Sequence, residues 1–320
     1  MKKIISKILY SLDEYGRRNL SRISREINTS QQRVSYNIAQ LEKKKNIDFT
    51  TLFDYSKFNL NGYLVLFQIL YHNLDEYQKV INFLKEQNEV VWLETLDGKY
   101  DLLLFFLTSN PSSFNKSLKD ILSKYPHTIK GYFISTTIVQ YNFQREYLNQ
   151  RKKDKKFRII GGDREPFNLD EKEKKVCQIL YENPRIKIVE ISKKINLSAT
   201  TVLKYIKKLK KENVIINFKP IIKNFNELGI INKRLLIKYH NFDIELEEKL
   251  ISFCKQHPNI IRLIKSFGAY DLILNLEFLK EKEFNIFLIE FREKFEKLID
   301  NFEIINTNKI EKQNYLPKYF

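Results

Sequence analysis

Cysteine and histidine are scarce in this chain of 320 residues, which holds two cysteines and four histidines. Cys177 and Cys254 lie far apart and form no Cys-x-x-Cys pair, and the histidines are scattered. A disulfide framework or a zinc site is therefore not expected, and the sequence fits a reducing compartment such as the cytoplasm. Because no catalytic or metal-binding set can be assembled from the spacing, we expect no catalytic residue, no metal ion and no cofactor.

Long apolar runs are also missing. No stretch approaches the roughly 18 apolar residues that a membrane-spanning helix needs. The first residues, MKKIISKILYSLDEYG, carry two acidic residues after a short apolar run, which is typical of a helix in a folded domain and not of a signal peptide. We therefore expect no membrane partner. Hydrophobic residues still make up 43% of the chain, enough for a sizeable core.

Glycine is rare, with eight in the chain, yet two of them introduce the same motif. GKYD at 98–101 runs on as LLLFF, and GAYD at 268–271 runs on as LILNL. ISREIN at 23–28 likewise matches ISKKIN at 191–196, and further matches keep the offset between 167 and 170. Ordered matches at a nearly constant offset indicate an internal repeat. The chain is therefore predicted to contain two copies of one unit of roughly 150 residues.

Each copy is predicted to hold two domains, joined to the next copy by a charged linker. The linker carries Gly161, Gly162, Pro166 and the basic run 151–156, without helical or strand periodicity. The predicted boundaries are 1–54 for a first winged helix-turn-helix, 55–146 for a first βαββαβ domain, 147–168 for the linker, 169–224 for a second winged helix-turn-helix and 225–320 for a second βαββαβ domain.

The start of each copy is typical of a helix-turn-helix. In the second copy, Asp170 and Glu173 form a capping-box pattern, and Ser198 is suited to begin a third helix. In the first copy, helices are expected at 3–14, 20–28 and 31–45. The alternating residues that follow each third helix predict a small hairpin or wing. Asn46 and Asn213 are expected where those helices stop, since asparagine tolerates the left-handed conformation.

The third helix of each copy is the expected DNA-reading element. Its exposed positions carry polar and basic side chains that can bond base edges and phosphates. The net charge of +17 and an isoelectric point near 9.5 also favour a polyanionic partner, double-stranded DNA first. The expected DNA-binding residues are Ser30, Gln31, Gln32, Arg33, Ser35, Tyr36 and Asn37 in the first copy, and Ser198, Thr200, Thr201, Lys204, Tyr205, Lys207 and Lys208 in the second.

The second part of each copy reads strand, helix, strand, strand, helix, strand, a ferredoxin-like order. In the second copy these elements are expected at about 232–241, 244–256, 259–267, 270–278, 281–297 and 301–311. Both helices would cover one face of the sheet, so the other apolar face needs a cover, most simply an identical sheet. The fold class is thus α+β, with two winged helix-turn-helix domains alternating with two βαββαβ domains.

Taken in order, these motifs resemble the Lrp/AsnC family of feast/famine transcriptional regulators, twice in one chain. The stretches that carry the resemblance are FNLDEKEKKVCQILYENPRIKIVEISKKINLSATTVLKYIKKLKKENVI, NELGI and FGAYDLILNLE. The resemblance implies DNA binding through the helix-turn-helix. It also implies a sensor domain (the RAM domain) that pairs through its sheet and often binds an amino acid near its Gly-x-x-Asp strand. It points to Gly98, Asp101, Thr137, Gly268, Asp271 and Thr307 as effector-binding residues, although the same residue types serve ordinary turns.

The repeat itself leads to further expectations. The two sensor domains should pair within the chain as a pseudo-dimer, and a further homo-oligomer such as a dimer is expected. The heads should be unequal, because the first copy lacks the Leu-Asp opening kept by Leu169 and Asp170. Asparagine replaces the glycine that usually follows the third helix in this family.

Two other functions remain open from the sequence. Siroheme decarboxylases resemble the same family and use two such units, and His72 and His240 recur in the repeated YHN. Such enzymes need histidine and arginine around an anionic tetrapyrrole, whereas a strand-end histidine is more often a surface residue. An architectural DNA-binding protein without an effector would carry the same sequence features.

Overall fold

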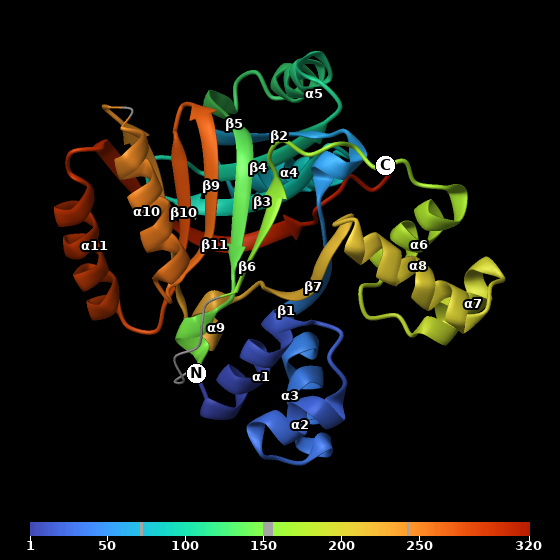
Figure 1. Ribbon diagram of the computed structural model, residues 1–320. Coiled ribbons are helices and arrows are strands. Elements are labelled where there is room, and N and C mark those ends of the chain that lie inside the picture. Colours follow the sequence, from blue (N-terminus) through green and yellow to red (C-terminus); the bar gives the residue numbers. More distant parts are fainter. Residues whose placement is uncertain (71–72, 150–155, 242) are drawn as a thin grey trace.

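The computed structural model describes residues 1–70, 73–149, 156–241 and 243–320 (Figure 1). His72 and the basic residues 151–155 lie outside these ranges. Two three-helix heads extend from a β-barrel, one below it and one to its right in Figure 1. The first head consists of α1 (Lys3–Glu14), α2 (Leu20–Ile27) and α3 (Gln31–Lys43). The second consists of α6 (Glu171–Glu182), α7 (Ile188–Ile195) and α8 (Ala199–Lys211).

Local capping explains where these helices begin. Asp170 accepts hydrogen bonds from the backbone of Lys172 and Glu173, and Glu173 accepts one from the Asp170 N–H, so the predicted capping box is present. Lys2, which precedes α1, makes no side-chain cap. The first head thus begins without the cap that Asp170 supplies to the second, a difference of about 1 kcal/mol in helix stability.

Left-handed residues end the helices, with one correction to the prediction. Asn213 has φ +57° after α8, as expected. In the first head the matching residue is Lys45, with φ +53°, and the prediction for Asn46 was wrong. Asn46 instead continues the chain toward β1 (Ile47–Phe53), where its backbone oxygen accepts from Lys223 N.

The two βαββαβ domains form as predicted. Four helices cover the outer face of their strands: α4 (Leu74–Glu86), α5 (Pro111–Lys124), α10 (Ile244–Gln256) and α11 (Glu281–Phe295). The strands of the first domain are β2 (Asn61–Ile69), β3 (Val90–Asp97), β4 (Leu102–Thr108) and β5 (Ile129–Phe143). Those of the second are β8 (Ile231–Tyr239), β9 (Ile260–Gly268), β10 (Leu272–Phe278) and β11 (Ile299–Gln313).

The sensor domains pair within the chain through their edge strands. The strand order is β2-β4-β3-β11-β8-β10-β9-β5-β6, with β2 also paired to β5. β3 of the first domain pairs with β11 of the second, and β5 with β9, all antiparallel. This closes the sheet on itself and leaves the barrel strands without an open edge. The expected intrachain pseudo-dimer is therefore present in the structure.

Burial on both faces of the strands gives the barrel two kinds of core. In β2, Val65 and Phe67 face the helices of their own domain, whereas Leu64 and Leu66 face inward. The inward cluster also contains Ile273 of the second domain, so side chains of both units share one core. Alternating burial of this kind explains why the strands read as continuous apolar runs.

Two predictions about connections were wrong. No wing hairpin forms within either head, because β1 pairs with β7 (Ile215–Ile222) of the other unit as a two-stranded ribbon. The linker is not wholly irregular either: β6 (Phe157–Gly161) pairs with the end of β5. Short elements complete the fold: η1 (Tyr55–Phe58), η2 (Glu146–Leu148) and α9 (Phe225–Leu228).

The two cysteines lie on different helices, α6 and α10. Cys177 and Cys254 are both buried and unbonded to one another. Within the described ranges, no helix combines the length and apolar character needed to cross a bilayer. The same part of the chain contains no group of three or more His, Cys, Asp or Glu side chains arranged to hold a metal ion.

Candidate nucleic-acid interface and sensor region

The third helix of the first head presents a polar surface to solvent. Gln31, Gln32 and Arg33 are exposed at its start, and Tyr36 is 65% exposed. Ser35 is exposed as well. Val34, Ile38 and Leu41 are buried on the opposite side. The helix can therefore offer amide, guanidinium and phenol groups without losing core contacts.

Two of the predicted residues in this head also have local structural roles. Ser30 accepts a hydrogen bond from Arg33 N at 3.2 Å and begins α3. Asn37 is half-buried, and its Nδ2 donates to Arg33 O at 2.7 Å. The second N–H of this amide is still able to donate to a phosphate oxygen.

In the second head, α8 presents a row of lysines. Lys204 and Lys207 are exposed, and neither forms an ion pair with any described residue. Thr200 is exposed beside them. Ser198 begins the helix by accepting from Thr201 N at 3.1 Å, and its Oγ also bonds the Thr201 hydroxyl. Lys204 and Lys207 are thus available to neutralise phosphates.

Lys208 and Tyr205, both expected at the DNA interface, also make contacts within the head. Lys208 Nζ lies 2.6 Å from Oε1 of Glu173, a carboxylate that is almost fully buried. This hydrogen bond raises the pKa of Lys208. Tyr205 is half-buried and packs against the core that joins the second head to the barrel. Both residues therefore help to hold α8 in place, while the Lys208 side chain stays 53% exposed.

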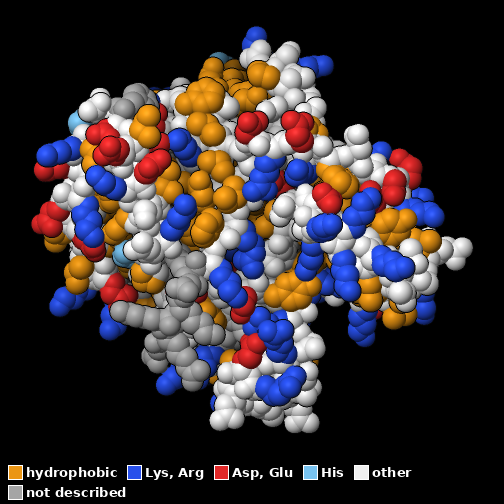
Figure 2. Space-filling view, in the orientation of Figure 1, with side chains coloured by type: hydrophobic (Ala, Val, Ile, Leu, Met, Phe, Trp, Pro, Cys, Tyr) orange, Lys and Arg blue, Asp and Glu red, His pale blue; other side chains and the backbone are white. Residues whose placement is uncertain are grey.

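The heads differ in surface charge. Figure 2 shows Lys and Arg side chains gathered over the second head at the right, and fewer over the tip of the first head at the bottom. The third helix of the first head begins with glutamine, glutamine and arginine, whereas that of the second carries Lys204 and Lys207. α8 is therefore the more basic of the two third helices and the better match for a polyanion.

The six residues expected at an effector site fall into two clusters, each built from both units. Gly98, at the β3–β4 turn, lies against Ile304 of β11, the strand that carries Thr307. Gly268, at the β9–β10 turn, pairs with Ser135 of β5, the strand that carries Thr137. The two clusters are therefore Gly98, Asp101 and Thr307 on one side, and Gly268, Asp271 and Thr137 on the other.

Both aspartates hold strand ends. Asp101 Oδ2 accepts from Ile69 N at 2.7 Å, and Asp271 Oδ2 accepts from Tyr239 N at 2.9 Å. Asp271 also pairs with Lys238 at 3.2 Å. Gly98 has φ +127° and Gly268 has φ +119°, values that L side chains rarely adopt. The repeated Gly-x-x-Asp is thus explained by the turn and strand end that it stabilises.

The two threonines differ in their hydrogen bonding. Thr307 Oγ1 donates to Glu94 at 3.3 Å. Thr137 Oγ1 is buried and has no hydrogen-bond partner among the described residues. A buried polar atom without a partner is costly unless a water or ligand satisfies it. Thr137 is therefore the residue of the six with free hydrogen-bonding capacity.

The tyrosines between these glycines and aspartates meet at the centre of the barrel. Tyr100 OH and Tyr270 OH lie 2.5 Å apart, and both side chains are buried. Burial and the bond to Tyr100 raise the pKa of Tyr270 well above its ordinary value. The repeated motif thus places one tyrosine from each unit at the pseudo-twofold axis. The sequence analysis missed this contact, although the exact repeat of Tyr-Asp was its signal.

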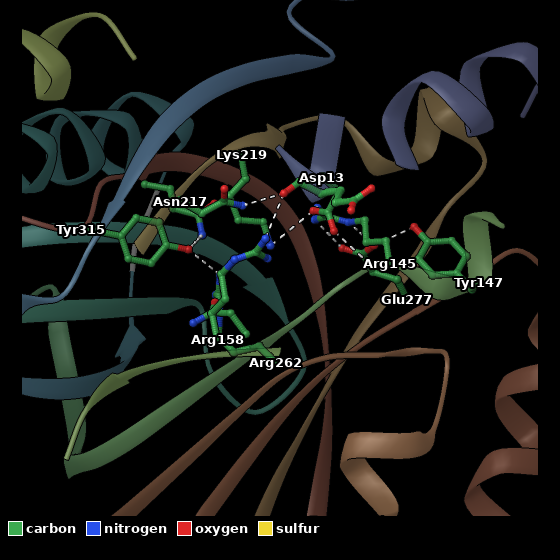
Figure 3. A network of polar contacts seen from close by, with 12 residues as sticks. Asp13, Arg145, Tyr147, Arg158, Asn217, Lys219, Arg262, Glu277 and Tyr315 are labelled. Carbon is green, nitrogen blue, oxygen red and sulfur yellow. Dashed lines mark hydrogen bonds and ion pairs between the residues drawn. The ribbon is translucent and has the colours of Figure 1, made fainter. Parts of the chain in front are cut away.

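A buried ionic network attaches the first head to the barrel (Figure 3). Asp13 of α1 is fully buried and pairs with Arg145 at 2.7 Å and with Lys219 of β7 at 3.3 Å. Arg145 also pairs with Glu277 of β10 at 2.8 Å, and Tyr147 OH donates to the same carboxylate at 2.6 Å. This network therefore joins one head, the ribbon and both sensor domains.

Burial sets the pKa values in this network. Burial lowers the pKa of Lys219 to about 8, although Asp13 opposes the shift. Burial alone would raise the pKa of Asp13, but Lys219 and Arg145 outweigh it and lower that pKa. Arg262 lies nearby and bonds Asn142 and the Tyr315 hydroxyl. The cavity beside these groups, about 30 Å³, has room for water but not for an amino acid.

The second head is attached by apolar packing instead. Phe320 packs against Phe53, Phe58 and Tyr181, with ring centroids 5.2–6.2 Å apart. Val176 and Leu180 of α6 belong to the same core cluster as the inner barrel. The repeat places Tyr181 where the first unit has Asp13, so one substitution changes the chemistry of attachment.

The described histidines lie away from this interior. His240 and His127 are exposed, and His257 packs against Phe253 and Phe287 on the outer side. The repeat of His72 and His240, which motivated the enzyme alternative, therefore leads to a surface position in the second unit.

Sequence comparison supports the assignment of the second head. Residues 169–216 match a family described as winged helix-turn-helix DNA-binding. The fold and this match define a protein with a three-helix head in each half of a paired barrel, of which the second head matches a DNA-binding family.

Relatives and solved structures extend the comparison. The chain is 27% identical to HTH-type transcriptional regulator FL11 of Pyrococcus furiosus, over 38% of this chain and 78% of that protein. It is 29% identical to an uncharacterised HTH-type transcriptional regulator of Pyrococcus abyssi, over 44% of this chain and 91% of that protein. The siroheme decarboxylase NirDL covers 100% of this chain and 95% of its own, with a TM-score of 0.61 and 12% identity, so it shares the fold. The chain is thus a tandem duplication, part of which resembles HTH-type transcriptional regulators.

Proposed function

We propose that this chain is a sequence-specific DNA-binding transcriptional regulator that acts in the cytoplasm. The observation that carries the proposal is the exposed lysine pair on α8, Lys204 and Lys207, within a segment that matches a DNA-binding family. In this mechanism α8 enters the major groove, its lysines contact phosphates, and α3 contributes a weaker second contact. Two unequal heads on one chain favour an asymmetric DNA site.

A small effector such as an amino acid would act at the sensor-domain interface. Support comes from the two clusters that draw residues from both units, and from Thr137 with its unpartnered hydroxyl. A ligand that bound between the units would favour one relative arrangement of the heads over another. The factor by which the effector changes DNA affinity would equal the ratio of the effector's affinities for the two arrangements.

Selection from mixed duplex fragments tests the DNA-binding function. We expect the chain to retain a subset of fragments against excess competitor DNA, and Lys204→Ala with Lys207→Ala to weaken that retention. Lys249→Ala is the matched control, because Lys249 is an exposed lysine on α10, far from either head. Equal retention of all fragments would indicate an architectural DNA-binding protein instead. No retention at low salt would remove the proposal.

Amino acids added to the same assay test the effector. A shift in fragment retention that disappears in Thr137→Val would support the interface site. Retention that no amino acid alters would leave a regulator without this effector class.

The enzyme alternative has a separate test. Titration with an iron tetrapyrrole should leave the absorbance spectrum of the ligand unchanged on the present account, since the described histidines are exposed or packed on the outer side. A saturable spectral shift at one ligand per chain would favour the enzyme.

A further inference from the structure

The outer face of α11 carries two exposed isoleucines. Ile286 is 56% exposed and Ile289 is 60% exposed, one helical turn apart. The opposite face of the helix is fully used, since Phe284, Phe287, Phe291 and Phe295 are buried against the sheet. α11 is the outermost helix at the left of Figure 1, so this apolar pair faces solvent.

Charged residues flank the isoleucines in a particular order. Lys282 and Glu283 lie one turn before them, and Arg292 and Glu293 one turn after, all exposed. None of these four forms an ion pair with another described residue. Other charges of the helix are paired: Lys294 lies 2.7 Å from Glu290, and Glu281 lies 3.0 Å from Lys233. The unpaired charges therefore surround the apolar pair.

This order is self-complementary under a twofold rotation. In an antiparallel pair of α11 helices centred between Phe287 and Leu288, each residue faces the one equally far beyond the centre. Lys282 then faces Glu293 of the other copy, and Ile286 faces Ile289. The helix period of 3.6 places these four residues on one stripe, with Glu283 on one side and Arg292 on the other. Glu283 and Arg292 remain on opposite sides of the contact under this rotation, so Lys282–Glu293 is the charge pair that it brings together.

We propose that α11 binds α11 of a second copy of this chain in an antiparallel, twofold-symmetric contact. Ile286 and Ile289 form its apolar centre, and a Lys282–Glu293 pair closes each of its two ends. A twofold contact closes, so it produces a dimer and not a filament. The contact is small, so the dimer forms and dissociates with concentration.

The first unit supplies an internal comparison. At the matching positions of α5, 170 residues earlier, Lys116 and Lys119 replace the two isoleucines. Ser112 and Ser123 replace the charged pair Lys282 and Glu293. The same rotation would bring Lys116 opposite Lys119, which is repulsive. The chain can therefore self-associate through its second unit and not through the first. The dimer would carry four heads, a consequence that holds whether or not they bind DNA.

Sedimentation velocity over a concentration series tests the contact. The wild-type chain should pass from monomer to dimer as its concentration rises. Ile286→Lys with Ile289→Lys, which copies α5, should leave a monomer throughout. Lys116→Ser on α5 is the matched control and should leave the dimerisation constant unchanged. Far-UV circular dichroism confirms that each variant is folded.

Charge reversal provides the decisive comparison. Lys282→Glu alone and Glu293→Lys alone should each weaken the dimer about tenfold or more, because each creates two like-charge contacts. The double variant restores opposite charges and should recover most of the affinity, which a merely destabilised helix would not do. Three results would each overturn the proposal. The wild-type chain could stay monomeric, the dimer could be unaffected by all of these changes, or the double variant could dimerise no better than the single variants.

Discussion

Gly98 and Gly268 occupy the same turn of the repeat, yet their surroundings differ. A Cβ atom on Gly268 would lie 2.5 Å from Ile134 O, whereas one on Gly98 would meet nothing closer than Ile304 O at 3.9 Å. Both residues have positive φ. The first glycine is therefore needed for its conformation, and the second also for the close approach of β5.

Alanine substitutions separate these two requirements. Gly98→Ala should lower the free energy of unfolding by about 1–3 kcal/mol through backbone strain. Gly268→Ala should cost roughly 2 kcal/mol more, because β5 must shift to relieve the clash. Urea unfolding of both variants measures the difference, and equal losses would contradict the close contact.

Lys219 gives a pH-dependent test of the buried network. Its pKa of about 8 in the fold lies below 10.5, so between these values the unfolded chain binds more protons. Stability contributed by this site should therefore rise with pH through that window. Lys219→Met should remove this part of the rise, measured as urea midpoints from pH 7 to pH 10.5. An unchanged pH profile in the variant would show that Lys219 titrates normally.

On the acid side, Asp13 makes stability rise with pH in the same direction, over a lower pH range. Because the pKa of Asp13 is lowered in the fold, its contribution is present above about pH 4 and is lost as the pH falls through its folded value. Asp13→Asn should cost about 3–5 kcal/mol at neutral pH, since Arg145 and Lys219 lose their shared carboxylate. The difference in the free energy of unfolding between variant and wild type should narrow as the pH falls below 4. A difference that stays constant with pH would contradict the lowered pKa of Asp13.

At the scale of elements, the helices and the sensor strands could be predicted from the sequence. Apolar spacing marked α1, α3, α8 and α10 to within two residues, because each buries one stripe. The wing could not be predicted in its true form. Ile47 and the residues after it alternate as an edge strand does, but the partner of Ile47 lies 175 residues away at Ile222. Local pattern identifies a strand and does not identify its partner.

The site was predictable to a similar degree. Exposed residues of α3 and α8 follow from helical periodicity, so the surface positions were correct for most of them. The contacts of Lys208 with Glu173 and of Tyr205 with the inner core could not be predicted, because these partners come from other elements. The ionic network escaped prediction for the same reason: Asp13, Arg145 and Glu277 are each more than 130 residues from the next.

The two lysines at the end of α8 should respond differently to substitution. Lys208→Ala removes the partner of a buried carboxylate and should lower the melting temperature by roughly 2–4 °C, with little effect on the salt dependence of DNA binding. Lys207→Ala should leave the melting temperature unchanged and reduce that salt dependence. Differential scanning calorimetry and DNA titration of both variants measure the two effects. The reverse pattern would return Lys208 to the DNA interface.

At the scale of the molecule, shared strands make the two units one folding body. The barrel is closed by β3–β11 and β5–β9, and the ribbon β1–β7 crosses between the heads. Trp92, the single tryptophan, lies on β3 at this junction and is buried under Arg262. Its surroundings therefore report on the contact between the units.

Unfolding of the whole chain should consequently be one transition. Trp92 fluorescence and far-UV circular dichroism should give the same urea midpoint, because the inner core cannot survive loss of either unit. Separate midpoints, with fluorescence changing first, would mean that the units come apart before they unfold.

The central claim, two unequal DNA-binding heads on one chain, is tested most directly by the slope of log affinity against log salt. Each lost phosphate contact should flatten this slope by about 0.9. We predict that Lys204→Ala with Lys207→Ala flattens it by about 2, and that Arg33→Ala in the first head flattens it by about 1. Two results would contradict DNA binding by two unequal heads. Either the slope stays at the wild-type value in both variants, or the wild-type chain binds no duplex at low salt.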